Sequence, residues 1–205
     1  MADQENQAPE APAEPKPPWE EKPVAPVAED AVGHAQVREV EEAVAGAVTE
    51  AVAYAGEITV TVAAGKLHDV CRACKDQLGY GFLVDLTAVD WNDRETGRFD
   101  VVYWLHRHRD QVRLRVKTAV AEGAAVASVT DVWKTANWME REVFDMFGVY
   151  FEGHPNLERI LTWEGFNGHP LRKDFPTEGI DTGAAVYPDV FPPGGGPAGG
   201  EEGKE

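Results

Sequence analysis

Three consecutive β-rich segments, joined by polar turns, constrain the fold of this chain more than any other feature. FLVDLTAVDW (82–91) and FDVVYWLHRH (99–108) flank the polar NDRETGR, which is the arrangement of a β-hairpin. A second turn near Arg109 and Asp110 leads to VRLRVK (112–117), where apolar and basic residues alternate. That alternation is typical of a strand with one buried face and one face in water.

The sequence upstream predicts further elements. EITVTV (57–62) alternates as a strand, and the segment 65–78 places five apolar residues on one helical stripe: Leu67, Val70, Cys71, Cys74 and Leu78. Before them, five valines between Val37 and Val52 recur at helical spacing, so we predict one amphipathic helix that Gly56 ends.

Two helices are predicted after the strands. Ser128 can cap a short helix over VTDVWK (129–134), because its hydroxyl can accept from a free N–H of the first turn. Asn137 can cap the next helix, WMEREVFDMFG (138–148), which Gly148 ends. The predicted fold class is α+β: a mixed, largely antiparallel sheet in β-α-β-β-β-α order with helices on one face, plus an extended irregular C-terminal arm.

Composition suggests four parts. Residues 1–32 contain half of the 14 prolines and many acids, so we predict a disordered acidic arm that buries too little apolar surface to order itself. Residues 33–150 form the α+β domain. Residues 151–180, punctuated by Gly and Pro, are predicted to be an extended docking segment, and 181–205 a flexible Pro/Gly-rich tail.

Net charge limits the partners. The formal net charge is −17, with 36 acids against 19 Lys and Arg, so a nucleic acid or an anionic lipid surface is not expected to bind through charge. No apolar run approaches the roughly 20 residues that span a bilayer, and MADQENQAPE lacks the parts of a signal peptide. We therefore expect a cytosolic chain without a membrane span of its own.

Three patterns resemble cofactor or metal sites. GGGPAG (194–199) fits a dinucleotide-binding motif, but that motif needs a strand before it and a helix after it, whereas here prolines precede it and a charged end follows. Cys71 and Cys74 form a CxxC, yet a structural zinc takes four ligands and the chain has two thiols, so core packing is preferred. His106 and His108 alternate with arginines, which favours a solvated basic edge over a metal site.

A serine nucleophile is not expected either. Ser128 is the only serine, and its surroundings are those of a helix cap rather than of a nucleophile elbow.

The helix 138–148 carries a group of charges: Glu140, Arg141, Glu142 and Asp145. With His154 or His169, two carboxylates could serve acid–base chemistry or bind a divalent metal. A partly buried ion network that fixes this helix to the following loop needs the same residues. The residue pattern favours the network without excluding the site.

Gly-His-Pro occurs twice, at 153–155 and 168–170. Each proline pushes its histidine out of the helical region, and each glycine lets the backbone approach a neighbour. LRKDFP then adds a compact charged group on a stiffened loop, which is typical of a surface offered to another protein. The predicted docking residues are Gly168, His169, Pro170, Leu171, Arg172, Lys173, Asp174, Phe175 and Pro176.

WMEREVFDMFGVYFEGHPNLERIL, followed by GFNGHPLRKDFP, closely resembles the signature of the thirty-kilodalton subunit family of respiratory complex I, the C subunit of the bacterial proton-translocating NADH:quinone oxidoreductase (NDH-1). The resemblance is strong over 130–176 and extends over roughly 35–180. The signature positions carried over are Glu140, Arg141, Glu142, Asp145, Gly148, Gly153, His154, Pro155 and Arg159. Glu158 departs from the family pattern, which more often has Arg there.

The resemblance implies a non-catalytic scaffold in the peripheral arm of the complex, on the cytoplasmic face of the bacterial cell membrane. It implies no flavin, iron–sulfur cluster or catalytic residue in this chain. The implied partners are the forty-nine-kilodalton quinone-site homologue and neighbouring Fe–S subunits, in a complex that uses NADH, FMN, Fe–S clusters and quinone.

Two other interpretations stay open. One is the equivalent subunit of a membrane-bound hydrogenase or of a quinone oxidoreductase with another electron donor. The other is a free-standing metalloenzyme that uses His154, His169, Glu142 and Asp145.

Overall fold

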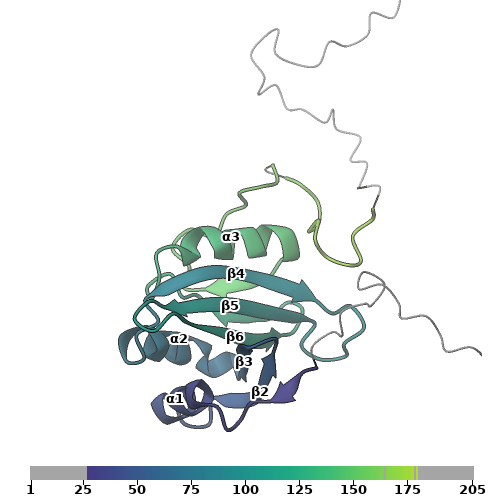
Figure 1. Ribbon diagram of the computed structural model, residues 1–205. Helices are drawn as coiled ribbons and strands as arrows, with labels where there is room; N and C mark the ends of the chain where they lie inside the picture. The colour runs from purple at the N-terminus through teal and green to yellow at the C-terminus, as the bar shows by residue number, and fades with distance from the viewer. Residues whose placement is uncertain (1–26, 164, 178, 180–205) are drawn as a thin grey trace, which may run out of the picture.

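The computed structural model describes residues 27–163, 165–177 and 179 (Figure 1). Its main sheet has six strands in the order β1-β2-β3-β6-β5-β4. All neighbours are antiparallel except β3 and β6, which run parallel. The largely antiparallel α+β fold is therefore confirmed. The strands are β1 (Glu29–Asp30), β2 (Val48–Tyr54), β3 (Glu57–Val62), β4 (Phe82–Asp90), β5 (Phe99–Arg107) and β6 (Val112–Val120).

The two faces of the sheet follow the alternation in the sequence. On the inner face Tyr103, Leu105 and Leu114 are buried. On the outer face the guanidinium of Arg115 bonds to Glu57 at 2.6 Å and lies over the ring of Trp104. Residues 112–117 thus present one apolar and one basic face, as predicted.

The helices cover the inner face of the sheet (Figure 1). They are α1 (Ala35–Ala43), the 3₁₀ turn η1 (Ala64–Lys66), α2 (Leu67–Asp76) and α3 (Ala136–Phe147). Both Cys71 and Cys74 on α2 are fully buried, which confirms their predicted place in the core. Burial raises the pKa of the Cys74 thiol to about 12, so this thiol is protonated and unreactive at neutral pH.

The predicted helix between Val37 and Gly56 is wrong in its second half. Helix α1 ends at Ala43, the chain turns at Gly46 with φ of 66°, and Val48–Tyr54 form β2. Val44, Val48 and Val52 are four residues apart, and a spacing of four satisfies the period of a strand as well as that of a helix. Pairing with β3 decides in favour of the strand.

Two predicted caps are also wrong. Ser128 does not begin a helix, since residues 129–134 contain turns at 130–132 and 134 but no helix, and the Ser128 hydroxyl bonds to Glu140. Helix α3 begins at Ala136 with Thr135 at the cap position, so the predicted cap Asn137 lies inside the helix. Gly148 does end the helix, with φ of 75°.

A second, smaller sheet holds the segments on either side of α3. Strands β7 (Ala125–Ala127) and β8 (Tyr150–Glu152) pair in parallel, an element that the sequence analysis missed. From residue 153 the chain has no regular element among the described residues; residues 153–163 and 165–177 are called the arm below.

The ends of the chain were predicted to be disordered or flexible tails. Residues 1–26 and 180–205, including GGGPAG, lie outside the described residues; β1 lies inside the predicted N-terminal arm of 1–32. None of the helices that the structure describes has the length and apolar character needed to cross a membrane.

Candidate functional site

Asp145, in the last turn of α3, ties the helix to the arm. Its side chain is fully buried. One carboxylate oxygen, Oδ1, accepts from Arg159 at 3.0 Å and from the hydroxyl of Thr162 at 2.5 Å. The other, Oδ2, accepts three successive backbone N–H groups, from Ile160, Leu161 and Thr162, at 2.8–3.1 Å. Successive N–H groups that converge on one oxygen form a site for an anion.

These donors decide the charge of Asp145. Burial alone would raise the pKa of this carboxyl, but the hydrogen bonds from Thr162, Leu161 and Ile160 outweigh burial and lower the pKa below its ordinary value. Asp145 is therefore ionised at neutral pH, and the arm neutralises it.

The second Gly-His-Pro loop closes the C-terminal end of the same helix. The last carbonyls of an α-helix have no partner within the helix. Here the Asp145 carbonyl contacts His169 Nδ1 at 2.9 Å, the Met146 carbonyl accepts from the Leu171 N–H at 3.1 Å, and the Phe147 carbonyl accepts from the Arg172 guanidinium at 2.5 Å. The positive guanidinium also suits the negative end of the helix dipole.

Gly148 makes this close approach possible. Its φ of 75° is accessible to glycine at little cost, and a Cβ at this position would lie 2.5 Å from both Arg172 Nη2 and His169 Nε2. Gly153 has a similar φ of 81° but open space around it. The two signature glycines therefore carry different constraints.

The charged residues after His169 are paired mostly within the chain. Arg172 bonds to Glu122 at 2.6 Å and stacks over Phe99, and its side chain is 17% exposed. Asp174 is 3.0 Å from Arg98, which also bonds to the buried Asp90.

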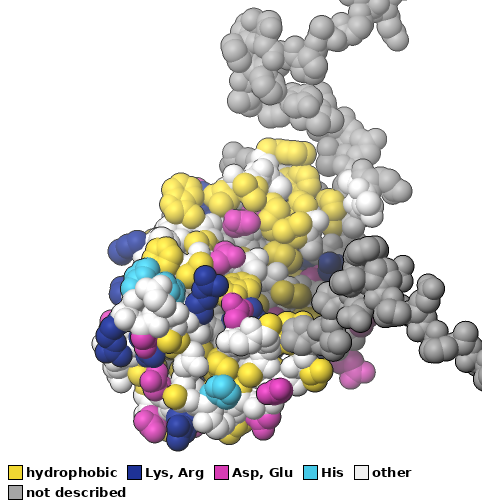
Figure 2. All heavy atoms as spheres, viewed as in Figure 1, with side chains coloured by type: hydrophobic (Ala, Val, Ile, Leu, Met, Phe, Trp, Pro, Cys, Tyr) yellow, Lys and Arg dark blue, Asp and Glu magenta, His cyan; other side chains and the backbone are white. Residues whose placement is uncertain are grey.

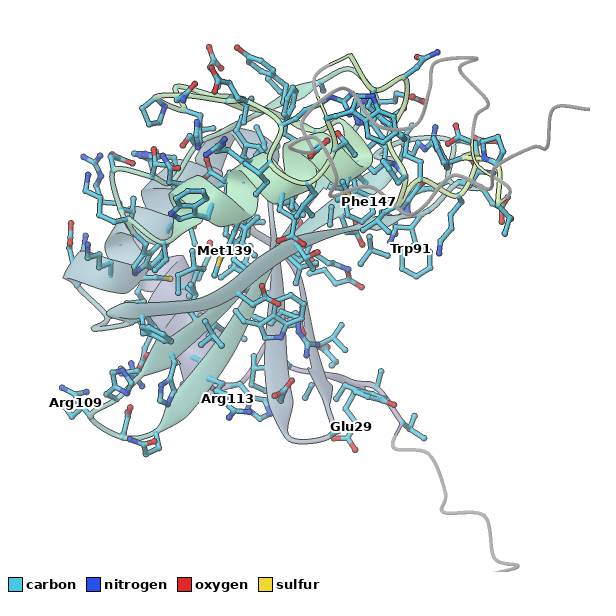
Figure 3. All side chains as sticks on the ribbon, turned by 90° about the horizontal axis from the view of Figure 1, so that it is seen from above. Glu29, Trp91, Arg109, Arg113, Met139 and Phe147 are labelled. Atoms are coloured by element: carbon cyan, nitrogen blue, oxygen red, sulfur yellow. The ribbon has the colours of Figure 1, made fainter. Side chains whose placement is uncertain are left out.

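Lys173 differs from its neighbours. Its backbone N–H donates to Asp90 at 2.8 Å, while no salt bridge involves its ammonium group among the described residues. It lines an open pocket of about 630 Å³ with Trp91, Val89 and Arg94. Figure 3 shows that Trp91 and Phe147 lie at the same end of the molecule, away from Arg109.

Other signature residues hold the beginning of the arm. The guanidinium of Arg141 bonds to the carbonyl of Glu158 at 3.0 Å and lies over the ring of Trp138. Arg141 is at i,i+4 spacing from Asp145, but the cation that contacts the Asp145 carboxylate is Arg159. Glu142 is exposed.

His154 is fixed by backbone groups at both ring nitrogens. The N–H of Asn156 donates to Nδ1 at 3.0 Å, so the proton of the neutral ring lies on Nε2, which donates to the Asn137 carbonyl at 3.2 Å. Pro155 follows at the surface.

The structure does not bring these residues together as ligands of a metal ion. Among the described residues, no three His, Cys, Asp or Glu side chains are placed to hold one metal ion. His154 has both nitrogens engaged and Asp145 has both oxygens occupied by donors, so neither aims a free lone pair at a metal or a substrate.

Several residues of the site were missed by the sequence analysis. Thr162, Asp90, Arg98 and Glu122 all hold the arm or its loop. They lie in segments far apart in the sequence, and no local pattern marks them. The remaining docking residues include Phe175, which stacks on Phe166, and Gly168, whose carbonyl accepts from Arg159. Pro170 lies in a turn, and the Pro176 carbonyl accepts from the Gly179 N–H at 3.0 Å.

Helix α3, strand β8 and the arm also expose large apolar side chains. Trp138 is 64% exposed and Leu161 is 63% exposed, and Tyr150, Trp163 and Leu171 are each about half exposed. Figure 2 shows hydrophobic side chains gathered over this upper part of the molecule. Large exposed apolar patches of this kind mark interaction surfaces.

Fold and arm together define a class of protein. A chain in the structure of the membrane-bound sulfane sulfur reductase, an archaeal respiratory membrane complex, superposes with a TM-score of 0.61 at 28% identity, covering 71% of this chain and 86% of that chain. The class is that of α+β proteins whose fold also occurs in a chain of this respiratory membrane complex.

Sequence comparison then gives the family. Residues 60–181 match the respiratory-chain NADH dehydrogenase 30 Kd subunit family. The NADH-quinone oxidoreductase C subunit of Rhodobacter capsulatus is 51% identical over 136 residues, which are 65% of this chain and 68% of that protein. Its counterpart in Geobacter sulfurreducens is 43% identical over 146 residues, 71% and 90% of the two chains. This chain belongs to that complex I subunit family, and the resemblance seen in the signature is confirmed.

Proposed function

We propose that this chain is a non-catalytic scaffold subunit in the peripheral arm of a bacterial NADH:quinone oxidoreductase, on the cytoplasmic face of the membrane. Its partners are the forty-nine-kilodalton quinone-site homologue and neighbouring Fe–S subunits. The assembled complex passes electrons from NADH through FMN and Fe–S clusters to quinone and couples this to proton translocation, while this chain binds none of these cofactors.

The anchored arm is the observation that carries the proposal. Asp145 and the carbonyls of α3 hold two stretches of the arm in place, so little conformational entropy is left to lose when a partner binds. The same arm exposes Leu161, Trp163 and Leu171. Rigid aromatic and aliphatic side chains on a fixed loop are typical of interface hot spots.

The contacts within the loop indicate which of its residues are free to bind a partner. Arg172 was predicted to face a partner, but its guanidinium is occupied by Phe147 and Glu122 of this chain. Lys173 instead lines the open pocket beside Trp91. We therefore assign the cationic contact to Lys173 and the fixing of the loop to Arg172.

Charge reversal tests this assignment. Lys173→Glu is expected to reduce co-purification of the chain with the other subunits, at an unchanged free energy of unfolding. The matched control is Lys134→Glu, an exposed lysine on the turn before α3, which should leave assembly intact. Normal assembly of Lys173→Glu would remove the cationic contact from the proposal. Arg172→Ala should impair both folding stability and assembly.

A second candidate follows from the solved neighbour. The chain in the sulfane sulfur reductase shows that this fold also occurs in a respiratory membrane complex of a different name. Co-purification from membranes, with partners identified by mass, separates the two candidates. Flavin- and NADH-binding subunits in the complex would support the first, and their absence the second.

A further inference from the structure

Glu140 stands apart from the other buried acids. Asp90, Asp100, Glu140 and Asp145 are all at most 4% exposed. Three of them have a cation in contact, at 2.6–3.0 Å: Asp90 with Arg98, Asp100 with Arg94 and Asp145 with Arg159. For Glu140, no Lys, Arg or His lies within salt-bridge distance in the part of the chain that the structure describes.

Within the described part of the chain, only neutral groups bond to the Glu140 carboxyl. Its Oε1 accepts from the backbone N–H of Val129 at 2.7 Å, and its Oε2 is 2.7 Å from the hydroxyl of Ser128. That hydroxyl is in turn 2.9 Å from the hydroxyl of Thr130. A short row of hydrogen bonds thus leads from the buried carboxyl to Thr130, which is 9% exposed.

This row can hold the carboxyl with or without a proton. When Glu140 is ionised, Ser128 donates to Oε2 and Thr130 donates to Ser128. When a proton from solvent binds to Oε2, that O–H donates to Ser128, and the Ser128 hydroxyl rotates to donate to Thr130. The heavy atoms keep their places, and every bond of the row persists with its direction reversed.

Among the described residues, the titratable groups that face Glu140 all carry negative charge when ionised. They are Tyr103 from β5, Cys71 from α2 and Asp131 from the preceding turn. Asp131 is itself held at the surface by His68 and Arg72. The acids of β4, which packs along α3, are engaged elsewhere: Asp85 by the N–H of Leu86 and Asp90 by Arg98; Glu152 of β8 is exposed.

From this geometry we infer that Glu140 is a proton-binding site, neutral in a large fraction of folded molecules near neutral pH, with Ser128 and Thr130 as the relay to solvent. Charge without a partner cation is costly in a dry interior, whereas the neutral carboxyl fits the hydroxyl row. Consistently, burial raises the pKa of Glu140 to about 7, against the opposing hydrogen bonds from Ser128 and Val129.

Folding then takes up a proton. The folded pKa lies above the ordinary value of 4.5, so the contribution of Glu140 to stability is complete below about pH 4.5 and is lost as the pH rises through about 7. Between pH 5.5 and 8.5 this group should raise the unfolding equilibrium constant about 30-fold.

Glu140→Gln tests the inference in the full chain. Glutamine retains one acceptor for Val129 and one N–H donor for Ser128, as the neutral acid does, but it cannot ionise. Urea unfolding at about pH 5.5, 7 and 8.5 should show the ratio of wild-type to variant unfolding constants rising about 30-fold. A ratio that stays constant would overturn the inference. Glu142→Gln, an exposed carboxyl on the same helix, should change no pH profile.

A direct titration covers the case in which Glu140→Gln does not fold. The side-chain carboxyl carbon of Glu140, assigned in the wild-type chain by carbon-13 NMR, should titrate with a midpoint near 7. A midpoint in the ordinary range of glutamate would contradict the inference. A structural role alone, with a permanently ionised carboxylate, predicts that ordinary or lower midpoint.

Discussion

Glu140 and Asp145 lie five residues apart on α3, and both side chains are fully buried, yet their pKa values move in opposite directions. Asp145 faces Arg159 and three backbone N–H groups of the arm. Glu140 faces a hydroxyl row and one N–H, without a cation among the described residues. Burial is common to both, so the number and charge of the donors determine which form is stable.

The two sites also respond to pH in opposite ways. The folded pKa of Asp145 is lowered, so its stabilisation is present above the unfolded value and is lost as the pH falls through the folded pKa. The contribution of Glu140 is lost as the pH rises. Stabilisation by Asp145 therefore requires a charged carboxylate, whereas stabilisation by Glu140 requires a neutral carboxyl.

Of the changes that test the difference between these two sites, removal of the Asp145 carboxylate should lower the free energy of unfolding the most. Asp145→Ala leaves Arg159 and the N–H groups of 160–162 without their acceptor, and we expect a loss of about 3–5 kcal/mol of unfolding free energy. Hydrogen exchange of the 160–162 amides should become fast. If those amides remained protected, the arm would be held by other contacts, and the central role of Asp145 would be refuted.

A methyl group at Gly148 should have the next largest effect. Gly148→Ala combines a positive φ with an approach of 2.5 Å to Arg172 and His169, so we expect a loss of about 2–3 kcal/mol and release of the 168–172 loop. Gly153→Ala is the matched control, because its φ is similar and its surroundings are open; about 1 kcal/mol is expected there. Thermal unfolding of both variants measures the difference, and equal losses would show that backbone strain alone matters.

The sequence allowed the local parts of this region to be predicted. Gly148 marked the end of α3, β-rich composition after a polar turn marked β5, and the apolar alternation marked β6. The partner of Asp145 could not be found in this way, because Arg141 is at the expected i,i+4 spacing while Arg159 reaches the site only through the path of the arm. The same holds for Ser128, whose surroundings fit a helix cap but whose hydroxyl bonds to Glu140, far along the chain.

Long-range pairing also explains the larger error in the fold. Val48 and Val52 fit both a helix and a strand, and only pairing with β3 selects the strand. The parallel β7–β8 pair joins segments on either side of α3, each three residues long, so neither segment carries a pattern of its own.

Acid should loosen the arm in a pH range in which Glu140 is already protonated and its contribution to stability is complete. As the pH falls below the ordinary aspartate range, protonation of Asp145 removes part of the stabilisation, with a smaller effect than deletion of the side chain because the hydrogen bonds persist in part. Asp145→Asn should lack this acid-dependent component. Acidification should therefore change the fluorescence of Trp163 in the wild-type chain and leave it nearly constant in the variant. An equal change in both chains would show that another group controls the arm.

Replacing Arg159, whose guanidinium faces Asp145, should lower the free energy of unfolding by less than the changes above. Arg159 bonds at once to Asp145, to Thr162 and to the Gly168 carbonyl, and a lysine keeps the charge but not this fork. Arg159→Lys is expected to lose about 1–2 kcal/mol in urea unfolding, with the pKa of Asp145 still lowered. A loss as large as that of Asp145→Ala would mean that the fork, rather than the charge, holds the arm.

Glu158→Arg should have the smallest effect, although it replaces an acid by the residue that the family pattern favours. Arg141 bonds to the carbonyl of Glu158 and not to its carboxylate. Among the described residues, the exposed Glu158 carboxylate accepts one hydrogen bond, from the Asn156 amide at 3.3 Å. The backbone carbonyl of residue 158 remains as an acceptor whatever side chain is present. We therefore expect the free energy of unfolding, measured in urea, to change by no more than about 0.5 kcal/mol. Arg141→Ala serves as the comparison, since it removes the donor itself and should cost about 1 kcal/mol. If Glu158→Arg cost as much as Arg141→Ala, the carboxylate would be supporting the guanidinium, and the charge at this position would belong to the network around Asp145.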